Sequence, residues 1–117
     1  MEFALLFYID ESRFEGLSAE EDRKLQEDCR AWDTGVEASG RLLLARALKT
    51  PDTARTVTIR ASKTMRTDGP FAETKEYLGG IVAVRAEGMD EALSIAESSP
   101  MAHYARIEVR PAYDIRA

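Results

Sequence analysis

The chain has 117 residues, the usual size of one domain, so we expect residues 1–117 to form a single domain around one core. Hydrophobic residues make up 44% and charged residues 32% of the sequence, a balance that argues against intrinsic disorder. The net charge of −5 argues against a nucleic-acid partner, because neutralising a phosphate backbone requires a basic excess.

Residues 2–9, EFALLFYI, predict a strand that is apolar on both faces. Side chains alternate between the two faces of a strand, and here both alternating sets are apolar. The sets are Phe3, Leu5, Phe7 and Ile9 on one face and Ala4, Leu6 and Tyr8 on the other.

A long helix is predicted from Ser18 to Gly40. Ser-Ala-Glu-Glu at its start is a capping box, and Gly40 is suited to end it in a left-handed conformation. Its apolar residues recur at intervals of four, three and four, which places them on one stripe: Leu25, Cys29, Trp32 and Val36. Because Cys29 lies on this stripe, we interpret it as a core residue rather than a reactive thiol.

Three strand-like segments follow at 41–48, 54–61 and 79–86. The alternation of apolar and polar residues in the segment 54–61 predicts that Val57 and Ile59 point inward. Residues 63–67 continue as a short extended piece, and residues 68–78 form a polar loop. Asp90 is expected to cap a second helix through Ser98, with Ala92, Leu93 and Ala96 facing the core. Pro100 ends it, and 105–112 is the last strand, with Ile107 and Val109 inward.

This order predicts an α+β protein of the ferredoxin-like βαββαβ type, with an insertion in its middle and both helices on one face of an antiparallel sheet. The segments 3–9, 42–45 and 81–84 are apolar on both faces, so a monomer would expose a second apolar surface. A two-fold dimer that packs sheet on sheet covers it, and we therefore expect a homodimer.

The polar loop contains candidate site residues. Gly69-Pro70 predicts a tight bend, at which Asp68 can bond backbone amides while Phe71 packs into the core. Alternatively, Asp68 and Glu73 serve as acid and base while Lys75 holds an anionic group. Residues 41–75 carry eight bases and three acids, which we interpret as solvated strand faces or, alternatively, as a local anion-attracting surface.

Residues 67–80, TDGPFAETKEYLGG, resemble the signature of the DGPF branch of the YCII-related proteins. The strand IVAVRA that follows, the Leu-Ser-x-Glu-Glu helix start and the closing Ile-Glu-Val-Arg-Pro extend the resemblance over the whole chain. The resemblance implies a dimeric α/β-barrel built from ferredoxin-like subunits. Other YCII-related proteins carry a histidine in the first helix and an aspartate-proline after the second, neither of which this chain has.

Three functions remain open on these grounds. The leading one is a dimeric module with a regulatory role, binding a small molecule in an apolar pocket under the loop at 68–76. A second is an acid/base enzyme, a lyase or isomerase acting on a small aromatic or lactone-like compound, as a few relatives do. A third is a protein-interaction partner of a transcription factor, since some relatives are encoded beside sigma factors.

The candidate residues are assigned as follows. Catalytic candidates are Asp10, Asp68 and Glu73, and ligand-binding candidates are Tyr8, Asp68, Phe71, Glu73 and Lys75. Asp10 follows the first strand beside Tyr8, where burial can raise the pKa of a carboxyl group. His103, the only histidine, can act as a general base but is read as an ordinary surface residue. We expect no metal and no cofactor, because neither ligand spacing nor a phosphate-binding glycine motif is present.

The cysteine content and the N-terminus predict the location of the protein. Cys29 is the only cysteine, which fits a reducing compartment. The opening MEFALLFYIDE lacks a basic segment, and its apolar run is too short for a signal peptide or a membrane span. We therefore expect a cytoplasmic protein without a membrane partner.

Overall fold

A computed structural model of the chain describes residues 1–116. Its main elements in chain order are β1 (Glu2–Asp10), α1 (Ala19–Ala38), β2 (Leu42–Ala47), β3 (Arg55–Arg60), β4 (Lys63–Asp68), β5 (Glu76–Arg85), α2 (Met89–Glu97) and β6 (Arg106–Pro111). Short 3-10 turns lie between them: η1 (Glu11–Phe14), η2 (Pro51–Thr53) and η3 (Pro100–His103).

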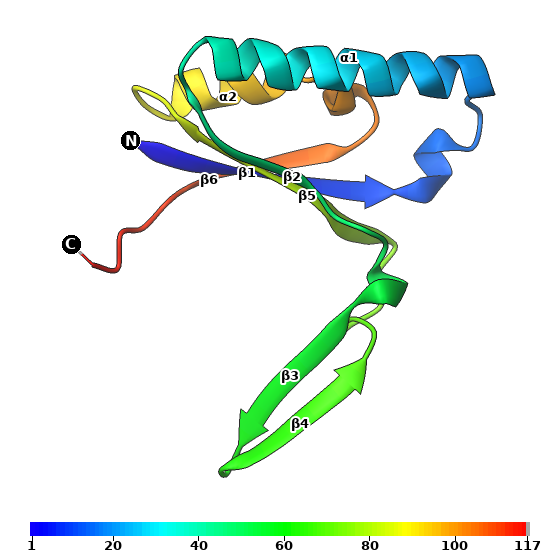
Figure 1. Cartoon of the computed structure of the whole chain (residues 1–117), viewed down its shortest axis with the longest axis vertical. Helices are drawn as coiled ribbons and strands as arrows, with labels where there is room; N and C mark the ends of the chain where they lie inside the picture. Colours follow the sequence, from blue (N-terminus) through cyan, green and yellow to red (C-terminus); the bar gives the residue numbers. More distant parts are fainter. Residues whose placement is uncertain (117) are drawn as a thin grey trace.

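Four strands form one antiparallel sheet in the order β2-β5-β1-β6. Both helices cover the same face of this sheet (Figure 1). With the hairpin β3–β4 set aside as an insertion, the order of elements is βαββαβ. The α+β, ferredoxin-like architecture predicted from the sequence is therefore confirmed.

The first helix begins and ends where its local signals predict. The Ser18 hydroxyl accepts from the Glu21 amide at 3.1 Å, and the Glu21 carboxylate accepts from the Ser18 amide at 3.1 Å. Gly40 has φ 79°, the left-handed conformation that glycine adopts without steric cost. Both ends of α1 are thus specified by neighbouring residues rather than by long-range packing.

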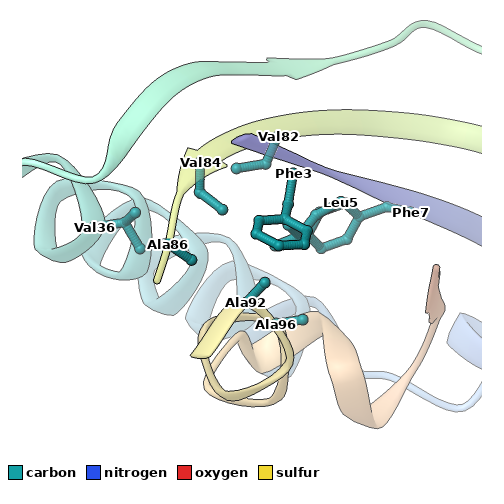
Figure 2. Close-up of a cluster of buried hydrophobic side chains, with 9 residues drawn as sticks. All are labelled: Phe3, Leu5, Phe7, Val36, Val82, Val84, Ala86, Ala92 and Ala96. Carbon is teal, nitrogen blue, oxygen red and sulfur yellow. The ribbon is translucent and has the colours of Figure 1, made fainter. Parts of the chain in front are cut away.

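The core lies between the sheet and the two helices (Figure 2). Alternation along β1 buries Phe3, Leu5 and Phe7 on the helix side, as predicted. The other core members are Val36, Val82, Val84, Ala86, Ala92 and Ala96, with Ile107 and Val109 packed against them. Ala92 and Ala96 are small, so α2 lies close to the sheet.

The second helix departs from the prediction at two residues. Its N-cap is Gly88 instead of Asp90, and it is Glu91 that binds back to the Glu87 amide, at 3.1 Å. The Glu91 carboxylate also pairs with Arg41. Leu93 is exposed rather than core-facing, because Ala92 and Ala96 define the buried stripe of this short helix.

The hairpin β3–β4 projects away from the sheet and helices (Figure 1). The radius of gyration is 16.4 Å, whereas a compact chain of this length has about 13 Å. Val57 and Ile59, predicted to point inward, are 62% and 65% exposed, so that prediction is wrong for the single chain. They alternate as expected, but no core lies beneath the hairpin within residues 1–116.

The sheet face opposite the helices is uncovered (Figure 1). Strand register places apolar side chains of three neighbouring strands on it: Ala4, Leu6 and Tyr8 of β1, Leu78, Ile81 and Ala83 of β5, and Leu44 of β2. The edge strand β6 contributes charged residues to this face instead, such as Glu108 opposite Leu6. The two-sided apolar character predicted from the sequence is therefore present in the fold.

None of the helices within residues 1–116 combines the length and the apolar character needed to cross a membrane.

Candidate functional site

The predicted loop borders a large pocket, which we call the hairpin-base pocket. It has a volume of about 920 Å³ and lies where the hairpin leaves the sheet. Residues 48–54 form one wall, residues 70–74 and the start of β5 form another, and Tyr8 reaches it from the open sheet face. The lining is largely apolar, as is usual for small-molecule sites.

The structure brings some of the predicted residues together and separates the others. Tyr8, Phe71 and Glu73 line the hairpin-base pocket, whereas Asp10, Asp68 and Lys75 do not. Two residues that sequence reasoning did not single out, Glu76 and Tyr77, also line it. Their signal was position, since they lie at the end of the predicted loop 68–78, where the structure instead begins the strand β5 at Glu76.

Phe71 does not pack into the core. Its side chain is 91% exposed, although it borders the pocket. Gly69, with φ 86°, and Pro70 bend the chain as predicted, but the bend turns Phe71 outward. The prediction that Phe71 packs into the core is therefore wrong for the single chain. Phe71 is instead a free apolar side chain at the pocket mouth.

Asp68 does not cap the turn. It is the last residue of β4, and its Oδ1 lies 3.0 Å from Nε of Arg55 on the opposite strand. The turn is held by other groups: the Gly69 amide donates to the Ala54 carbonyl, and the Thr56 hydroxyl donates to the Gly69 carbonyl, each at 2.8 Å. Because the Asp68 side chain is 90% exposed, the ion pair contributes little stability.

Asp10 and Lys75 form an ion pair beside the pocket. Lys75 Nζ lies 3.6 Å from Oδ2 of Asp10, whose Oδ1 accepts from the Ser12 amide and hydroxyl at 3.1 and 2.7 Å. The Ser12 hydroxyl lowers the pKa of the Asp10 carboxyl, with smaller contributions from the Ser12 amide and Lys75. Asp10 is therefore ionised at neutral pH and serves as the N-cap of η1 rather than as a proton donor.

Tyr77 contributes a neutral hydroxyl near the pocket. Its hydroxyl donates to Oε1 of Glu11 at 2.8 Å. Burial, together with this hydrogen bond, raises the pKa of Tyr77 to about 12. The neighbouring Glu76 pairs with Arg106 at 3.2 Å. His103 lines neither this pocket nor the one described next, and its backbone carbonyl accepts from Arg13 at 3.0 Å.

A second pocket of about 260 Å³, the helix–sheet pocket, lies between α1 and the sheet. The helix contributes Cys29, Trp32 and Asp33 to it, and the sheet contributes Phe7 and Ile9 among others. Sequence reasoning missed Asp33 because it treated the stripe of α1 as wholly apolar. The available signal was its spacing, since Asp33 lies four residues after Cys29 and therefore on the same side of the helix.

Cys29 is half-buried and borders this pocket, so it is less enclosed than predicted. Burial raises the pKa of its thiol, and the charges of Asp33 and Asp28 raise it further. We expect native Cys29 to react with a thiol reagent such as Ellman's reagent several-fold more slowly than in the denatured protein, because only the thiolate is nucleophilic. Equal rates in the native and denatured protein would contradict this. The Asp33→Asn variant should react faster than the wild type.

No group of three or more histidine, cysteine, aspartate or glutamate side chains placed to hold a metal ion occurs within residues 1–116.

This chain is similar to known proteins in its domain family, in its sequence and in its fold. The sequence pattern of the YCII-related domain matches residues 1–116. An uncharacterised protein, R00369 of Rhizobium meliloti (strain 1021), is 36% identical over 113 residues, which cover 95% of this chain and 91% of that protein. The solved structure of 5-chloro-2-hydroxyhydroquinone dehydrochlorinase (TftG) from Burkholderia phenoliruptrix AC1100, in complex with 2,5-dihydroxybenzoquinone, superposes with a TM-score of 0.55. It is 16% identical and covers 99% of this chain and 97% of its own, which shows a shared fold.

Proposed function

Because the chain belongs to the YCII-related domain family, we propose that it is a homodimeric protein that binds a small molecule in the hairpin-base pocket. We assign it to the DGPF branch on its run TDGPFAETKEYLGG, and we give it a cytoplasmic location and a regulatory role. The observation that carries the binding function is the pocket itself. Its volume of about 920 Å³ falls in the range of ligand sites, and the signature loop forms its wall.

The homodimer is supported by two exposed features. The first is the open apolar sheet face, which spans three strands about 4.8 Å apart and up to about 30 Å long, or about 430 Å². The second is the hairpin, whose exposed Val57 and Ile59 extend this apolar surface toward the roughly 800 Å² per partner of a stable interface. Charge does not oppose the contact on the central strands, since their side chains on this face are apolar.

The hairpin also requires a partner for its own stability. An isolated two-stranded hairpin is at best marginally stable in water. Its turn residues Ala61 and Ser62 have φ 49° and 64°, which costs of order 1 kcal/mol each because neither is glycine. Packing Val57 and Ile59 against a second copy offsets these costs. The partner would then also close the mouth of the hairpin-base pocket.

An acid/base enzyme is the second candidate, and it is favoured by one observation. A protein of the same fold, the Burkholderia dehydrochlorinase, acts on a substituted hydroxyhydroquinone, so this architecture can hold a small ring compound. Against this role stands Asp10, whose carboxyl has a lowered pKa and serves a structural cap. Glu73 at the pocket wall is the remaining catalytic candidate there.

Ligand binding is tested by a thermal-shift screen of small aromatic acids, lactones and phosphorylated metabolites. A true ligand at 100 times its dissociation constant stabilises by about 2.7 kcal/mol, which raises the melting temperature by about 10 °C. The shift should be lost in Phe71→Ala and Glu73→Ala, since both residues line the pocket. Glu73→Ala should not change the melting temperature without ligand, because the Glu73 side chain is exposed.

Asp68→Ala is the matched control for this screen. Asp68 belongs to the same segment, but it pairs with Arg55 outside the pocket. The variant should therefore keep the ligand-induced shift and lower the melting temperature by at most a few degrees. A ligand whose shift survives in Phe71→Ala and Glu73→Ala does not bind in the hairpin-base pocket, and the proposed site is then wrong.

A further inference from the structure

The charged side chains of the hairpin-base pocket are mostly acidic. Within residues 1–116, its lining includes the acids Asp52, Glu73 and Glu76 and the single base Lys49. This reverses the charge of the surrounding sequence, since residues 41–75 carry eight bases and three acids. In this fully described segment, two of the three acids line the pocket and seven of the eight bases do not.

The other bases of this segment lie elsewhere. Lys75 is paired with Asp10, and Arg41 is paired with Glu91. Four more belong to the hairpin that projects away from the sheet (Figure 1): Arg55, Arg60, Lys63 and Arg66. The positive charge of the sequence is therefore carried mainly by the hairpin, and the anion-attracting surface considered from the sequence is not this pocket.

The three carboxylates of the pocket differ in how far other side chains neutralise them. Oε1 of Glu76 lies 3.2 Å from Nε of Arg106, so its charge is compensated. Asp52 accepts from a threonine hydroxyl, which is neutral and leaves the negative charge in place. Glu73 is exposed and has no hydrogen bond or ion pair within residues 1–116. Two uncompensated carboxylates therefore stand against one lysine.

The pKa of Tyr77 agrees with this negative charge. Burial, the hydrogen bond to Glu11 and the negative charges of Glu11 and Asp52 raise the pKa of Tyr77 to about 12. No basic side chain within residues 1–116 acts against this increase. The charge of Asp52 is therefore felt at the wall of the pocket.

Aromatic side chains line the same pocket as these carboxylates. Tyr8 reaches it from the open sheet face, and Phe71 lies two residues before Glu73 on the loop. Because the Phe71 side chain is 91% exposed, the faces of its ring are free. An aromatic face attracts a cation that lies within about 6 Å of the ring centre. A free carboxylate beside a free aromatic ring is thus suited to an organic ammonium ion.

We propose that the hairpin-base pocket takes an organic cation, a small amine whose ammonium group pairs with Glu73 and Asp52 and whose apolar part contacts Phe71. This inference rests on the proposed function, because it names the class of compound for that pocket. The acids and phosphorylated metabolites of the thermal-shift screen should bind there more weakly than such an amine, since the same carboxylates repel them.

The probes are benzylamine, benzyl alcohol and benzoate, which share one ring and differ in charge. The backbone amides of Ala72 and Thr74 border the pocket, so their shifts in nitrogen-15 correlation spectra locate binding and give the affinity. We expect benzylamine to bind about tenfold more tightly than benzoate, because each exposed charge contact changes affinity by up to about fivefold and the anion reverses its sign. Benzyl alcohol should lie between them. Added salt should weaken benzylamine but not benzyl alcohol.

Four variants separate charge from structure. Glu73→Gln should weaken benzylamine about threefold, whereas Lys49→Gln should strengthen it by a similar factor, and neither should change benzyl alcohol. A merely structural effect of these substitutions would not have opposite signs. Phe71→Ala should weaken all three probes. Glu37→Gln is the control for net charge and should change no affinity, because Glu37 is equally exposed but belongs to α1, on the other side of the sheet.

Three results would overturn the inference: benzoate binding as tightly as benzylamine, benzylamine binding that survives both Phe71→Ala and Glu73→Gln, or an effect of Glu37→Gln as large as that of Glu73→Gln. If benzylamine fails while another compound shifts the Ala72 and Thr74 amides, the pocket binds ligands and only the charge of its ligand is wrong. If neither the probes nor any compound of the thermal-shift screen shifts these amides, the proposed function fails as well.

Discussion

The chain is expected to sediment as a particle of about 26 kDa, twice its mass of 13.0 kDa, whereas the Leu6→Glu variant should sediment at about 13 kDa. Leu6 lies at the centre of the open sheet face, opposite Ile81 on one side. A carboxylate there would be buried without a partner in a sheet-on-sheet dimer, and the cost of several kcal/mol is expected to dissociate the dimer. Sedimentation equilibrium at micromolar concentration measures both masses.

Leu93→Glu provides the control for this experiment. Leu93 is 39% exposed and belongs to α2, on the other side of the sheet from Leu6. The same change from leucine to glutamate should therefore leave the dimer intact. A wild-type mass of 13 kDa would contradict the homodimer, and dissociation of the Leu93→Glu variant would place the interface on the helices instead.

The features that the sequence predicted well are specified by neighbouring residues. The capping box at Ser18 needs only Glu21 three positions later, and Gly40 needs only its own backbone freedom. The alternation of β1 likewise follows from the period of a strand and the burial of one face. These signals are local, so they survive without knowledge of the rest of the fold.

The hairpin shows why other predictions were wrong. Val57 and Ile59 alternate correctly, but alternation indicates which side of a strand is apolar and not whether this side meets the same chain. The prediction for Phe71 is wrong for the same reason. Its apolar character predicts burial, whereas the bend at Gly69 directs it outward. If the chain dimerises as proposed, these side chains are buried between copies, and a single sequence does not distinguish the two cases.

The candidate sites depend on contacts that spacing does not reveal. Tyr8 and Glu73 are 65 positions apart and line one pocket, although no pattern in the sequence places these two ligand-binding candidates side by side. Asp33 was missed because its place in the helix–sheet pocket depends on Ala47 and Gly80, two small residues of other strands that leave the space in front of it. A cavity forms where small side chains leave space unfilled, whereas the patterns in a sequence indicate mainly which residues make contacts.

Leu5→Ala should lower the free energy of unfolding by about 2–5 kcal/mol, the usual effect of truncating a fully buried leucine. Leu5 is 0% exposed and packs on the helix side of β1 between Phe3 and Phe7 (Figure 2). The loss has two parts, the removed apolar contacts and the cavity left beside α2, where Ala92 is too small to fill it. Urea denaturation followed by circular dichroism measures the change.

Leu93→Ala should lower the free energy of unfolding by much less than Leu5→Ala, because Leu93 is already partly in contact with water. A comparison of Leu5→Ala with Leu6→Glu then distinguishes the contributions of the two faces of β1. Leu5→Ala removes contacts within one chain, so its effect should be independent of protein concentration, whereas the Leu6→Glu effect should shrink as dilution dissociates the wild-type dimer. If the Leu5→Ala effect also varied with concentration, the helix-side core would be coupled to the interface, and the two layers of this fold would not be energetically separate.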